Sequence, residues 1–195
     1  RYFDSFDHYY TLYQQRNTEL WIEYGEGKIT KDELNRQRFF YPLQAVGVED
    51  EALAEQFSKD FFAIIPTKST LMPHAKEVLE YLAPKYNLYI LSNGFRELQS
   101  CKMRSAGVDG YFKKVILSED LGVLKPWPAI FNFALSATQS ELRESLMIGD
   151  SWEADITGAH GVGMHQAFYN VTERTTFPFL PTYHIHSLKE LMDLL

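Results

Sequence analysis

The sequence has little cysteine, no run of Lys and Arg, and no long apolar segment. Each of these absences argues against a class of protein. Its one cysteine, Cys101, cannot form an internal disulfide, which favours a reducing compartment. The formal net charge is -7 without a basic cluster, so we do not expect a nucleic acid polymer as a partner. No apolar stretch approaches the ~20 residues of a membrane-spanning helix, and the beginning RYFDSFDHYY lacks a signal-peptide pattern. We therefore expect a soluble, cytoplasmic protein without membrane contact.

The residues that are present indicate a helical region followed by an α/β region. Of the 195 residues, 45% are hydrophobic and 23% charged, which is typical of globular proteins. From about Phe6 to Phe62, apolar and aromatic residues recur at helical spacing. Gly25 and Gly27 interrupt this pattern, and Thr30 with Glu33 predicts a capping box at the start of the next helix.

From about residue 71, short apolar strands alternate with amphipathic helices. Four segments read as strands: NLYILSNG (87–94), FKKVILSED (112–120), ESLMIGD (144–150) and GMHQAFYNV (163–171). The alternation predicts right-handed crossovers and a parallel sheet, hence the α/β fold class. Ser187 and Glu190 predict a capping box for a final helix. Prolines between Pro66 and Pro73 favour two domains there, 1–68 and 69–195.

Polar residues gather just beyond the predicted strands, where ligands bind in open parallel sheets. The candidates are Ser92, Asn93 and Gly94 after the first strand, Lys125 followed by Pro126 in the loop after the second, and Gly149, Asp150 and Ser151 after the third, with Asp155 further on. Each has an ordinary explanation when taken alone. Ser-Asn-Gly suits a turn, a single lysine is commonly solvated, Asp150 could cap a helix, and Asp155 could be a surface acid.

Together these residues offer what the hydrolysis of a phosphate ester requires. Hydroxyl and amide groups can bind phosphoryl oxygens, and Lys125 can stabilise their negative charge. Asp150 can hold Mg²⁺, which is bound by one or two carboxylates together with water and substrate phosphate. The histidines His74, His160, His165, His184 and His186 show no ligand spacing tied to a recognisable site, so we interpret them as structural or surface residues.

The three polar segments, in this order, resemble the second, third and fourth motifs of the haloacid dehalogenase-like hydrolase superfamily. Two further segments, WIEYGEGKITKDELNRQRF (21–39) and SNGFRELQSCKMRSAGVDGYF (92–112), resemble the helical-cap branch that includes bacterial pyrimidine 5′-nucleotidases. The resemblance implies a Rossmann-like parallel sheet core, here residues 69–195, and an inserted helical cap, here residues 1–68.

The resemblance also implies a role for each candidate. Ser92, Asn93 and Gly94 would bind the phosphoryl group together with Lys125, which would also neutralise the attacking carboxylate. Asp150 would ligate Mg²⁺, and Asp155 would orient the water shell of the metal or the loop. Glu153 is expected to face solvent.

The nucleophile of such an enzyme would be an aspartate of an Asp-x-Asp pair, which forms an aspartyl-phosphate while the second acid transfers protons. Neither acid can be assigned here, because Asp4 and Asp7 do not follow an apolar strand. We expect that the natural protein has roughly 10 to 20 residues before Arg1, which carry this pair and the first core strand. That strand would lie between the strands ending at Leu91 and Ile148, and without it the sheet should not be stable. Direct pairing of those two strands would contradict this prediction.

The sequence therefore favours a Mg²⁺-dependent phosphatase of a small phosphorylated metabolite, with pyrimidine nucleoside 5′-monophosphates ahead of sugar phosphates. Two alternatives stay open. A metal-independent 2-haloacid dehalogenase would share Ser-Asn-Gly and the lysine, but it would have no use for the acid at Asp150. A non-catalytic binding protein on the same scaffold would not need an Asp-x-Asp pair. The sequence predicts neither the natural substrate nor the oligomeric state.

Overall fold

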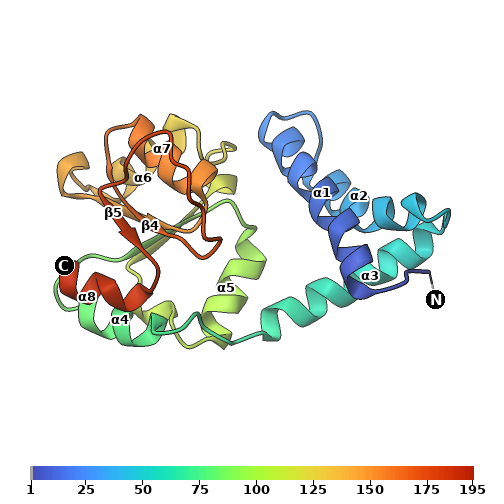
Figure 1. Cartoon of the computed structure of the whole chain (residues 1–195), viewed down its shortest axis with the longest axis horizontal. Coiled ribbons are helices and arrows are strands. Elements are labelled where there is room, and N and C mark those ends of the chain that lie inside the picture. The colour runs from blue at the N-terminus through green and yellow to red at the C-terminus, as the bar shows by residue number, and fades with distance from the viewer. Residues whose placement is uncertain (1) are drawn as a thin grey trace. The chain divides into compact units, whose positions relative to one another are not determined.

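The computed structural model describes residues 2–195 and divides the chain into two compact units, Arg1–Thr67 and Lys68–Leu195 (Figure 1). Every regular element described in the first unit is a helix, and the second unit alternates strands with helices. None of the helices in residues 2–195 is long and apolar enough to cross a membrane.

The helical unit is built from three α-helices whose starts are fixed by capping side chains. They are α1 (Phe6–Gly25), α2 (Lys31–Ala45) and α3 (Glu51–Ile64), followed by a short 3₁₀ turn (Ile65–Thr67). Ser5, Thr30 and Asp50 each accept a hydrogen bond from the backbone N–H three residues ahead. The predicted helix start at Thr30 is therefore confirmed. Gly27 adopts a φ of 70°, which glycine tolerates without strain and which ends α1 before α2 begins.

The core of the helical unit is rich in aromatic rings. Phe39, Phe40, Leu43 and Ala54 are buried and pack against rings from all three helices. Arg38 lies in the same core and is only 5% exposed. Its guanidinium lies 5.2 Å from the centroid of the Phe39 ring, and 5.3 and 5.1 Å from those of two further rings, Phe61 and Phe62. This cation is therefore surrounded by aromatic faces, an arrangement that attracts it electrostatically.

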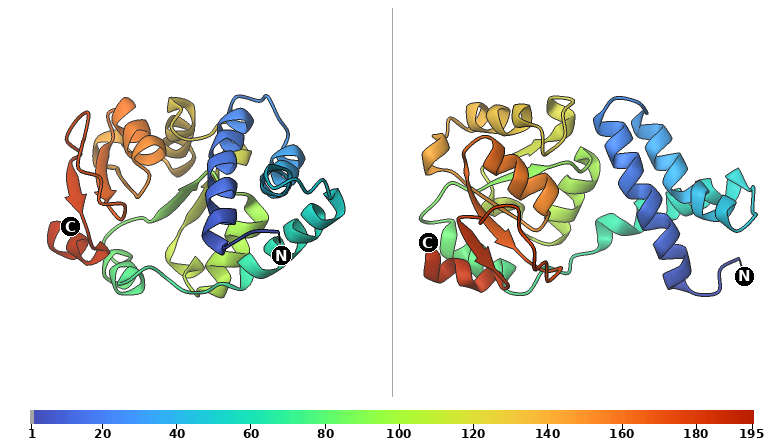
Figure 2. Two further views of the ribbon diagram at one scale, coloured as in Figure 1. Left: turned by 45° about the vertical axis from the view of Figure 1, so that its right-hand side comes forward. Right: turned by 45° about the horizontal axis from the view of Figure 1, so that its top comes forward.

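The α/β unit contains five short parallel strands in two sheets (Figures 1 and 2). β1 (Tyr89–Ser92) pairs with β2 (Lys114–Leu117), and β3 (Leu146–Gly149), β4 (His165–Tyr169) and β5 (Tyr183–Ile185) pair in that order. The helices are α4 (Ala75–Leu82), α5 (Arg96–Ser105), α6 (Pro128–Thr138), α7 (Thr157–Gly161) and α8 (Leu191–Leu194). Short helical turns lie at Asp109–Tyr111, Ser118–Asp120, Leu142–Glu144, Trp152–Ile156 and Leu188–Glu190, of which Trp152–Ile156 is π-helical.

Two hydrophobic layers cover the strands. One contains Val78 and Leu82 of α4 with Leu191 of α8, and the other contains Ile130 and Phe131 of α6 with a residue of α7. Figure 1 shows α4 and α8 on one side of the strands and α6 and α7 on the other. In β3, Leu146 and Ile148 contact the first layer while Met147 contacts the second, as the two-residue period of a strand requires. The predicted α/β fold with a parallel sheet is confirmed.

The two sheets share these layers without a ladder between β1 and β3. Leu91 of β1 and Met147 of β3 both contact the layer of α6 and α7, while Leu88 and Ile148 contact the layer of α4 and α8. In the part of the chain that the structure describes, β1 pairs only with β2 and β3 only with β4. Direct pairing of β1 with β3 is thus not observed, and the expected intervening strand stays a prediction.

Candidate active site

The polar residues singled out in the sequence lie where the strands end. Ser92 is the last residue of β1, and Asp150 directly follows β3. Lys125 lies in the loop between β2 and α6, and its peptide bond to Pro126 is cis. Hydrogen bonds and an ion pair connect the loops that follow these three strands, so segments 30 or more residues apart in sequence form one site.

Asn93 joins the loop after β1 to the loop that carries Lys125. Its Oδ1 accepts a hydrogen bond from the backbone N–H of Lys125 at 2.8 Å, and its Nδ2 donates to the carbonyl of the same residue at 3.1 Å. The same Oδ1 accepts a third bond, at 2.7 Å, from the hydroxyl of Ser118, which is buried just after β2. One amide side chain therefore fixes the loop after β1 to two points of the loop between β2 and α6.

The hydroxyl of Ser92 is arranged to donate to a ligand. Its Oγ accepts hydrogen bonds from the backbone N–H of Gly94 at 3.0 Å and from Nε2 of Gln99 at 2.7 Å. A serine hydroxyl has two acceptor lone pairs and one hydrogen. Because both lone pairs are occupied, the remaining O–H hydrogen is available for an acceptor such as a phosphoryl oxygen.

Lys125 and Asp155 form a buried ion pair at the end of β1. Nζ of Lys125 lies 2.6 Å from Oδ1 of Asp155, and the two side chains are 10% and 7% exposed. The same ammonium donates to the carbonyl of Leu91 at 2.8 Å. An ammonium has three hydrogens, so one stays available for a ligand while the other two fix its position. Asp155 is therefore buried. The interpretation of the sequence in which Asp155 is a surface acid is wrong.

Asp155 also holds the loop that follows β3. Its Oδ2 accepts the backbone N–H of Ser151 at 3.1 Å, and its carboxylate lies so close to Gly149 that a Cβ atom there would overlap it. Glycine at 149 is thus a steric requirement of the ion pair. Asp155 belongs to the π-helical turn Trp152–Ile156, a rare geometry that is frequent at functional sites.

Asp150 has the environment of a metal ligand more than that of a helix cap. The cap of the π-turn is Ser151, whose Oγ accepts the N–H of Ala154 at 3.1 Å. Asp150 is exposed, and no residue described by the structure donates a hydrogen bond to its carboxylate. An exposed carboxylate without a protein donor is free to bind a cation such as Mg²⁺, which needs few protein ligands. Within residues 2–195 no group of three His, Cys, Asp or Glu side chains could hold a metal.

Two residues of the site were not foreseen from the sequence. Ser118 and Gln99 position Asn93 and Ser92, yet neither was considered a candidate. Ser118 directly follows β2, so the rule that selected Ser92 after β1 could have found it. Gln99 lies on α5, seven residues after Ser92, and no local pattern distinguishes it from a surface residue of that helix.

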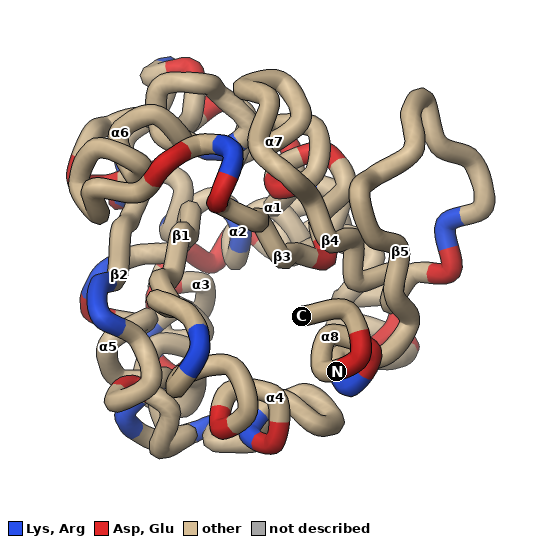
Figure 3. Tube along the Cα trace, turned by 90° about the vertical axis from the view of Figure 1, so that its left-hand side faces the viewer, with Lys and Arg blue, Asp and Glu red and all other residues tan. Residues whose placement is uncertain are grey.

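Charged residues of both signs are distributed along the backbone of the α/β unit. In Figure 3 its Lys and Arg residues and its Asp and Glu residues are scattered in short segments of both signs. The positive charge that an anionic ligand would meet is therefore local, and Lys125 supplies it.

Three comparisons place the chain among known proteins. Residues 4–163 match the family model described as haloacid dehalogenase-like hydrolase. The chain is 33% identical to the pyrimidine 5′-nucleotidase YjjG of Escherichia coli (strain K12), over 94% of this chain and 80% of that protein. It is 31% identical to the pyrimidine 5′-nucleotidase PynA of Streptococcus pneumoniae, over 96% of this chain and 79% of that protein.

A solved structure is also similar over nearly the whole chain. It is that of the putative hydrolase YfnB from Bacillus subtilis bound to magnesium, with a TM-score of 0.85 and 32% sequence identity. The similarity covers 97% of this chain and 82% of that one.

Proposed function

The chain belongs to the haloacid dehalogenase-like hydrolase family, and on that premise we propose that it is a Mg²⁺-dependent phosphatase of a small phosphomonoester. We further propose that its preferred substrates are pyrimidine nucleoside 5′-monophosphates. The single observation that carries the proposal is the buried Lys125–Asp155 ion pair at the end of β1, where the ammonium binds Asp155 and the carbonyl of Leu91 among the described residues and can donate its third hydrogen to a ligand. The two nucleotidase relatives support the choice of substrate.

The residues present would perform binding and charge stabilisation. The Ser92 hydroxyl and the third hydrogen of Lys125 would donate to phosphoryl oxygens, with Gly94 allowing close backbone approach. Asn93 and Asp155 would hold these donors in place before substrate arrives, so that little reorganisation is needed during reaction. Asp150 would hold Mg²⁺, which would supply further neutralisation of the phosphoryl charge. The domain roles follow from this assignment, with residues 69–195 as the hydrolase core and residues 1–68 as its cap.

We propose that a carboxylate attacks phosphorus, that the alcohol leaves with a proton from a second acid, and that water then cleaves the aspartyl-phosphate. Asp4 and Asp7 stay unassigned, because Asp4 precedes the N-cap of α1 and Asp7 lies in its first turn.

The test is a phosphatase assay of the full-length natural protein on p-nitrophenyl phosphate, with Mg²⁺ and with a chelator. We expect activity only with Mg²⁺, and a loss on the order of 10²-fold or more in Asp150→Asn, because even changes to the partners of metal ligands cost 10–100-fold. Asp109→Asn, an exposed aspartate of the same unit, is the matched control and should keep full activity. Full activity with the chelator would refute the magnesium requirement. In a screen over nucleotides and sugar phosphates, the highest kcat/KM on a hexose phosphate would refute only the nucleotide preference.

A further inference from the structure

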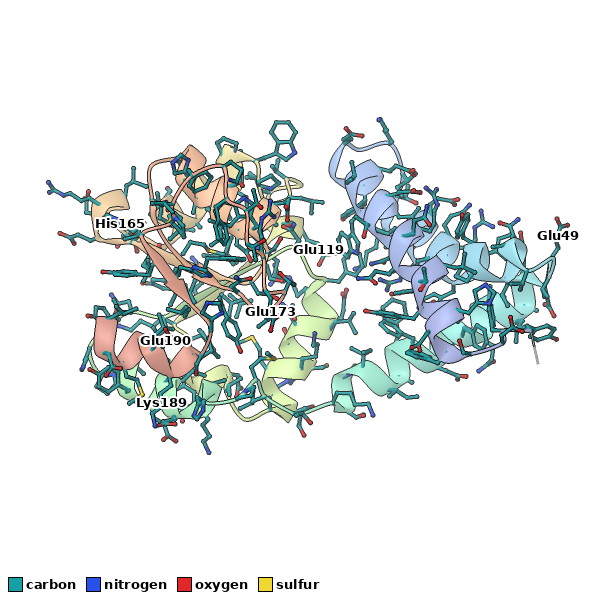
Figure 4. All side chains as sticks on the ribbon, viewed as in Figure 1. Glu49, Glu119, His165, Glu173, Lys189 and Glu190 are labelled. Carbon is teal, nitrogen blue, oxygen red and sulfur yellow. The ribbon has the colours of Figure 1, made fainter. Side chains whose placement is uncertain are left out.

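The segment that follows β4 folds into a tight turn, Asn170–Arg174, organised by one buried amide. Oδ1 of Asn170 accepts the backbone N–H of Arg174 at 2.8 Å, and its Nδ2 donates to the carbonyl of Arg174 at 2.9 Å. Nδ2 also lies 3.0 Å from Nε2 of His184 on β5. The Asn170 side chain is 3% exposed, and Figure 4 labels Glu173 within this turn. The position of the Arg174 backbone is therefore fixed from inside the unit.

From this turn, the side chain of Arg174 reaches two consecutive residues of the π-turn. Its Nη1 lies 2.6 Å from Oε1 of Glu153, and its Cζ lies 5.1 Å from the centroid of the Trp152 ring. Its Nε donates to the carbonyl of Thr176 at 2.9 Å, which fixes the plane of the guanidinium. The hydrogen bond from Arg174 lowers the pKa of Glu153, which keeps the carboxylate charged. Glu153 is thus exposed, as predicted, yet it has a defined partner.

Aromatic rings also pack against the side chain of Trp152. It is 4% exposed, and its ring centroid lies 5.2 Å from that of Phe168 on β4. Phe177 and Phe179, from the loop after the Asn170–Arg174 turn, lie 5.0 and 4.9 Å away. Trp152, the first residue of the π-turn, is therefore fixed by contacts with β4 and with the loop that follows β4.

The same π-turn carries Asp155, the partner of Lys125. Only one residue separates Glu153 from Asp155, so a rotation of the turn that releases Glu153 also moves the carboxylate that orients the ammonium. The Arg174–Glu153 pair contributes little to the stability of the unit, because the Glu153 side chain is 75% exposed. Its geometric effect is larger, because positioning errors near 1 Å at a reacting group cost up to ~10²-fold in rate.

We propose that Arg174 is a positioning residue of this hydrolase. It holds the π-turn through Glu153 and Trp152, and thereby keeps Asp155 and Lys125 in the geometry that binds the phosphoryl group. This inference rests on the phosphatase function proposed above.

The test compares Arg174→Ala with Lys189→Ala in the full-length protein with Mg²⁺ and p-nitrophenyl phosphate. Lys189 is a matched control, because it forms an exposed ion pair with Glu77 at 3.3 Å in the same unit. In Arg174→Ala we expect kcat to fall roughly 10-fold or more, with KM nearly unchanged. The Tm of both variants should fall by no more than ~2–4 °C, as expected for a weak surface pair. Arg174→Lys keeps a charge for Glu153 and should recover part of the lost kcat. An unchanged kcat in Arg174→Ala would overturn the proposal.

Amide hydrogen exchange of residues 151–156 separates failure of this inference from failure of the proposed function. The amides of Ala154, Asp155 and Ile156 all bond to Ser151, so exchange reports directly on the π-turn. We expect faster exchange there in Arg174→Ala and not in Lys189→Ala. Unchanged exchange overturns the positioning role even if the protein is a phosphatase. Faster exchange in a protein whose wild type hydrolyses no phosphate ester refutes the phosphatase and leaves Arg174 as the residue that fixes the turn.

Discussion

Each of the two units buries a cation, and the two cations are stabilised in different ways. Lys125 in the α/β unit has a carboxylate at 2.6 Å and a carbonyl at 2.8 Å. Arg38 in the helical unit is surrounded by phenylalanines and shares a side-chain hydrogen bond with Tyr13, while its Nε has no hydrogen-bond partner in the part of the chain that the structure describes. Aromatic faces stabilise a charge without directing it, whereas the ion pair fixes the ammonium and leaves it a spare donor. The two buried cations therefore differ in their partners, because a carboxylate orients Lys125 whereas aromatic rings surround Arg38.

The same contrast extends to other buried polar groups. Among residues 2–195, the buried side-chain atoms without a hydrogen-bond partner are Oδ1 of Asn17, Oδ1 of Asn35 and Nε of Arg38, all in the helical unit. In the α/β unit, the buried polar side chains Ser118, Asp155, Gln166 and Asn170 all form hydrogen bonds. A fully satisfied network is rigid, which suits chemistry that depends on fixed distances.

The largest effect should come from removing each cation in turn. Lys125→Met should lower kcat on the order of 10²-fold or more, because a donor to the developing charge is lost. It should also lower the free energy of unfolding by about 3–5 kcal/mol, because Asp155 is left buried without its partner. Arg38→Met should leave kcat unchanged and alter the free energy of unfolding by less than about 2 kcal/mol, because no buried carboxylate loses its partner.

Steady-state kinetics and urea denaturation of both variants, made in the full-length protein, measure these effects. If Arg38→Met lowered kcat as much as Lys125→Met does, the distinction between a structural and a reactive cation would be wrong. A change confined to KM in Lys125→Met would limit this lysine to ground-state binding.

A smaller effect should come from crowding the ion pair while both partners remain. In Gly149→Ala the new methyl group would overlap the Asp155 carboxylate, and we expect a loss of about 1–3 kcal/mol in the free energy of unfolding, as for other overpacked sites. Lys125 should be displaced with its partner, so kcat should fall as well. The measurements are thermal unfolding and kcat on p-nitrophenyl phosphate.

Gly110→Ala provides the matched comparison, because a Cβ at that glycine of the same unit would meet nothing within 4 Å. It should be nearly neutral in both measurements. Equal behaviour of the two alanine variants would mean that the ion pair tolerates movement, contrary to the rigidity inferred for this unit.

The smallest effect concerns titration in the helical unit. Burial, and secondarily the charge of Tyr13, raises the pKa of Tyr9 to about 12, above its ordinary value of 10.0. The folded state therefore binds the phenolic proton more tightly than the unfolded state. The corresponding stability is fully present below pH 10 and is lost as the pH rises from 10 to about 12.

Thermal unfolding at pH 9 and pH 11 tests this prediction. The fall in Tm between these two pH values should be larger in the wild type than in Tyr9→Phe, whereas replacement of the exposed Tyr2 by Phe should not change it. An identical fall in wild type and Tyr9→Phe would show that Tyr9 titrates alike in the folded and unfolded states.

The sequence predicted those features that have a local signal. The four longer strands followed from apolar runs, and the starts of α2 and of the C-terminal helical turn followed from Thr30 and Ser187 with a glutamate three residues on. The positions of Ser92, Lys125 and Asp150 followed from the rule that ligands bind beyond strand ends. These signals need only a few neighbouring residues, so they can be read without knowing how the chain folds.

Features that depend on distant partners were not predictable. β5 has three residues, too few for a period to be recognised, and its place beside β4 depends on the loop between them. The pairing of Lys125 with Asp155 joins residues 30 apart, and that of Glu153 with Arg174 joins residues 21 apart. Both are set by packing of strands and turns, which the spacing of residues along the chain does not encode.

The bridge made by Asn93 has a consequence for motion. Because one amide binds the backbone N–H and carbonyl of Lys125 and also the Ser118 hydroxyl, the loop after β1 and both ends of the loop between β2 and α6 cannot fluctuate independently while these bonds are intact. Opening any of them on the microsecond to millisecond timescale requires these bonds to break together. The resonances of residues 93, 118 and 125 should then share a single exchange rate, so that this part of the site behaves as one two-state element rather than as two separate loops.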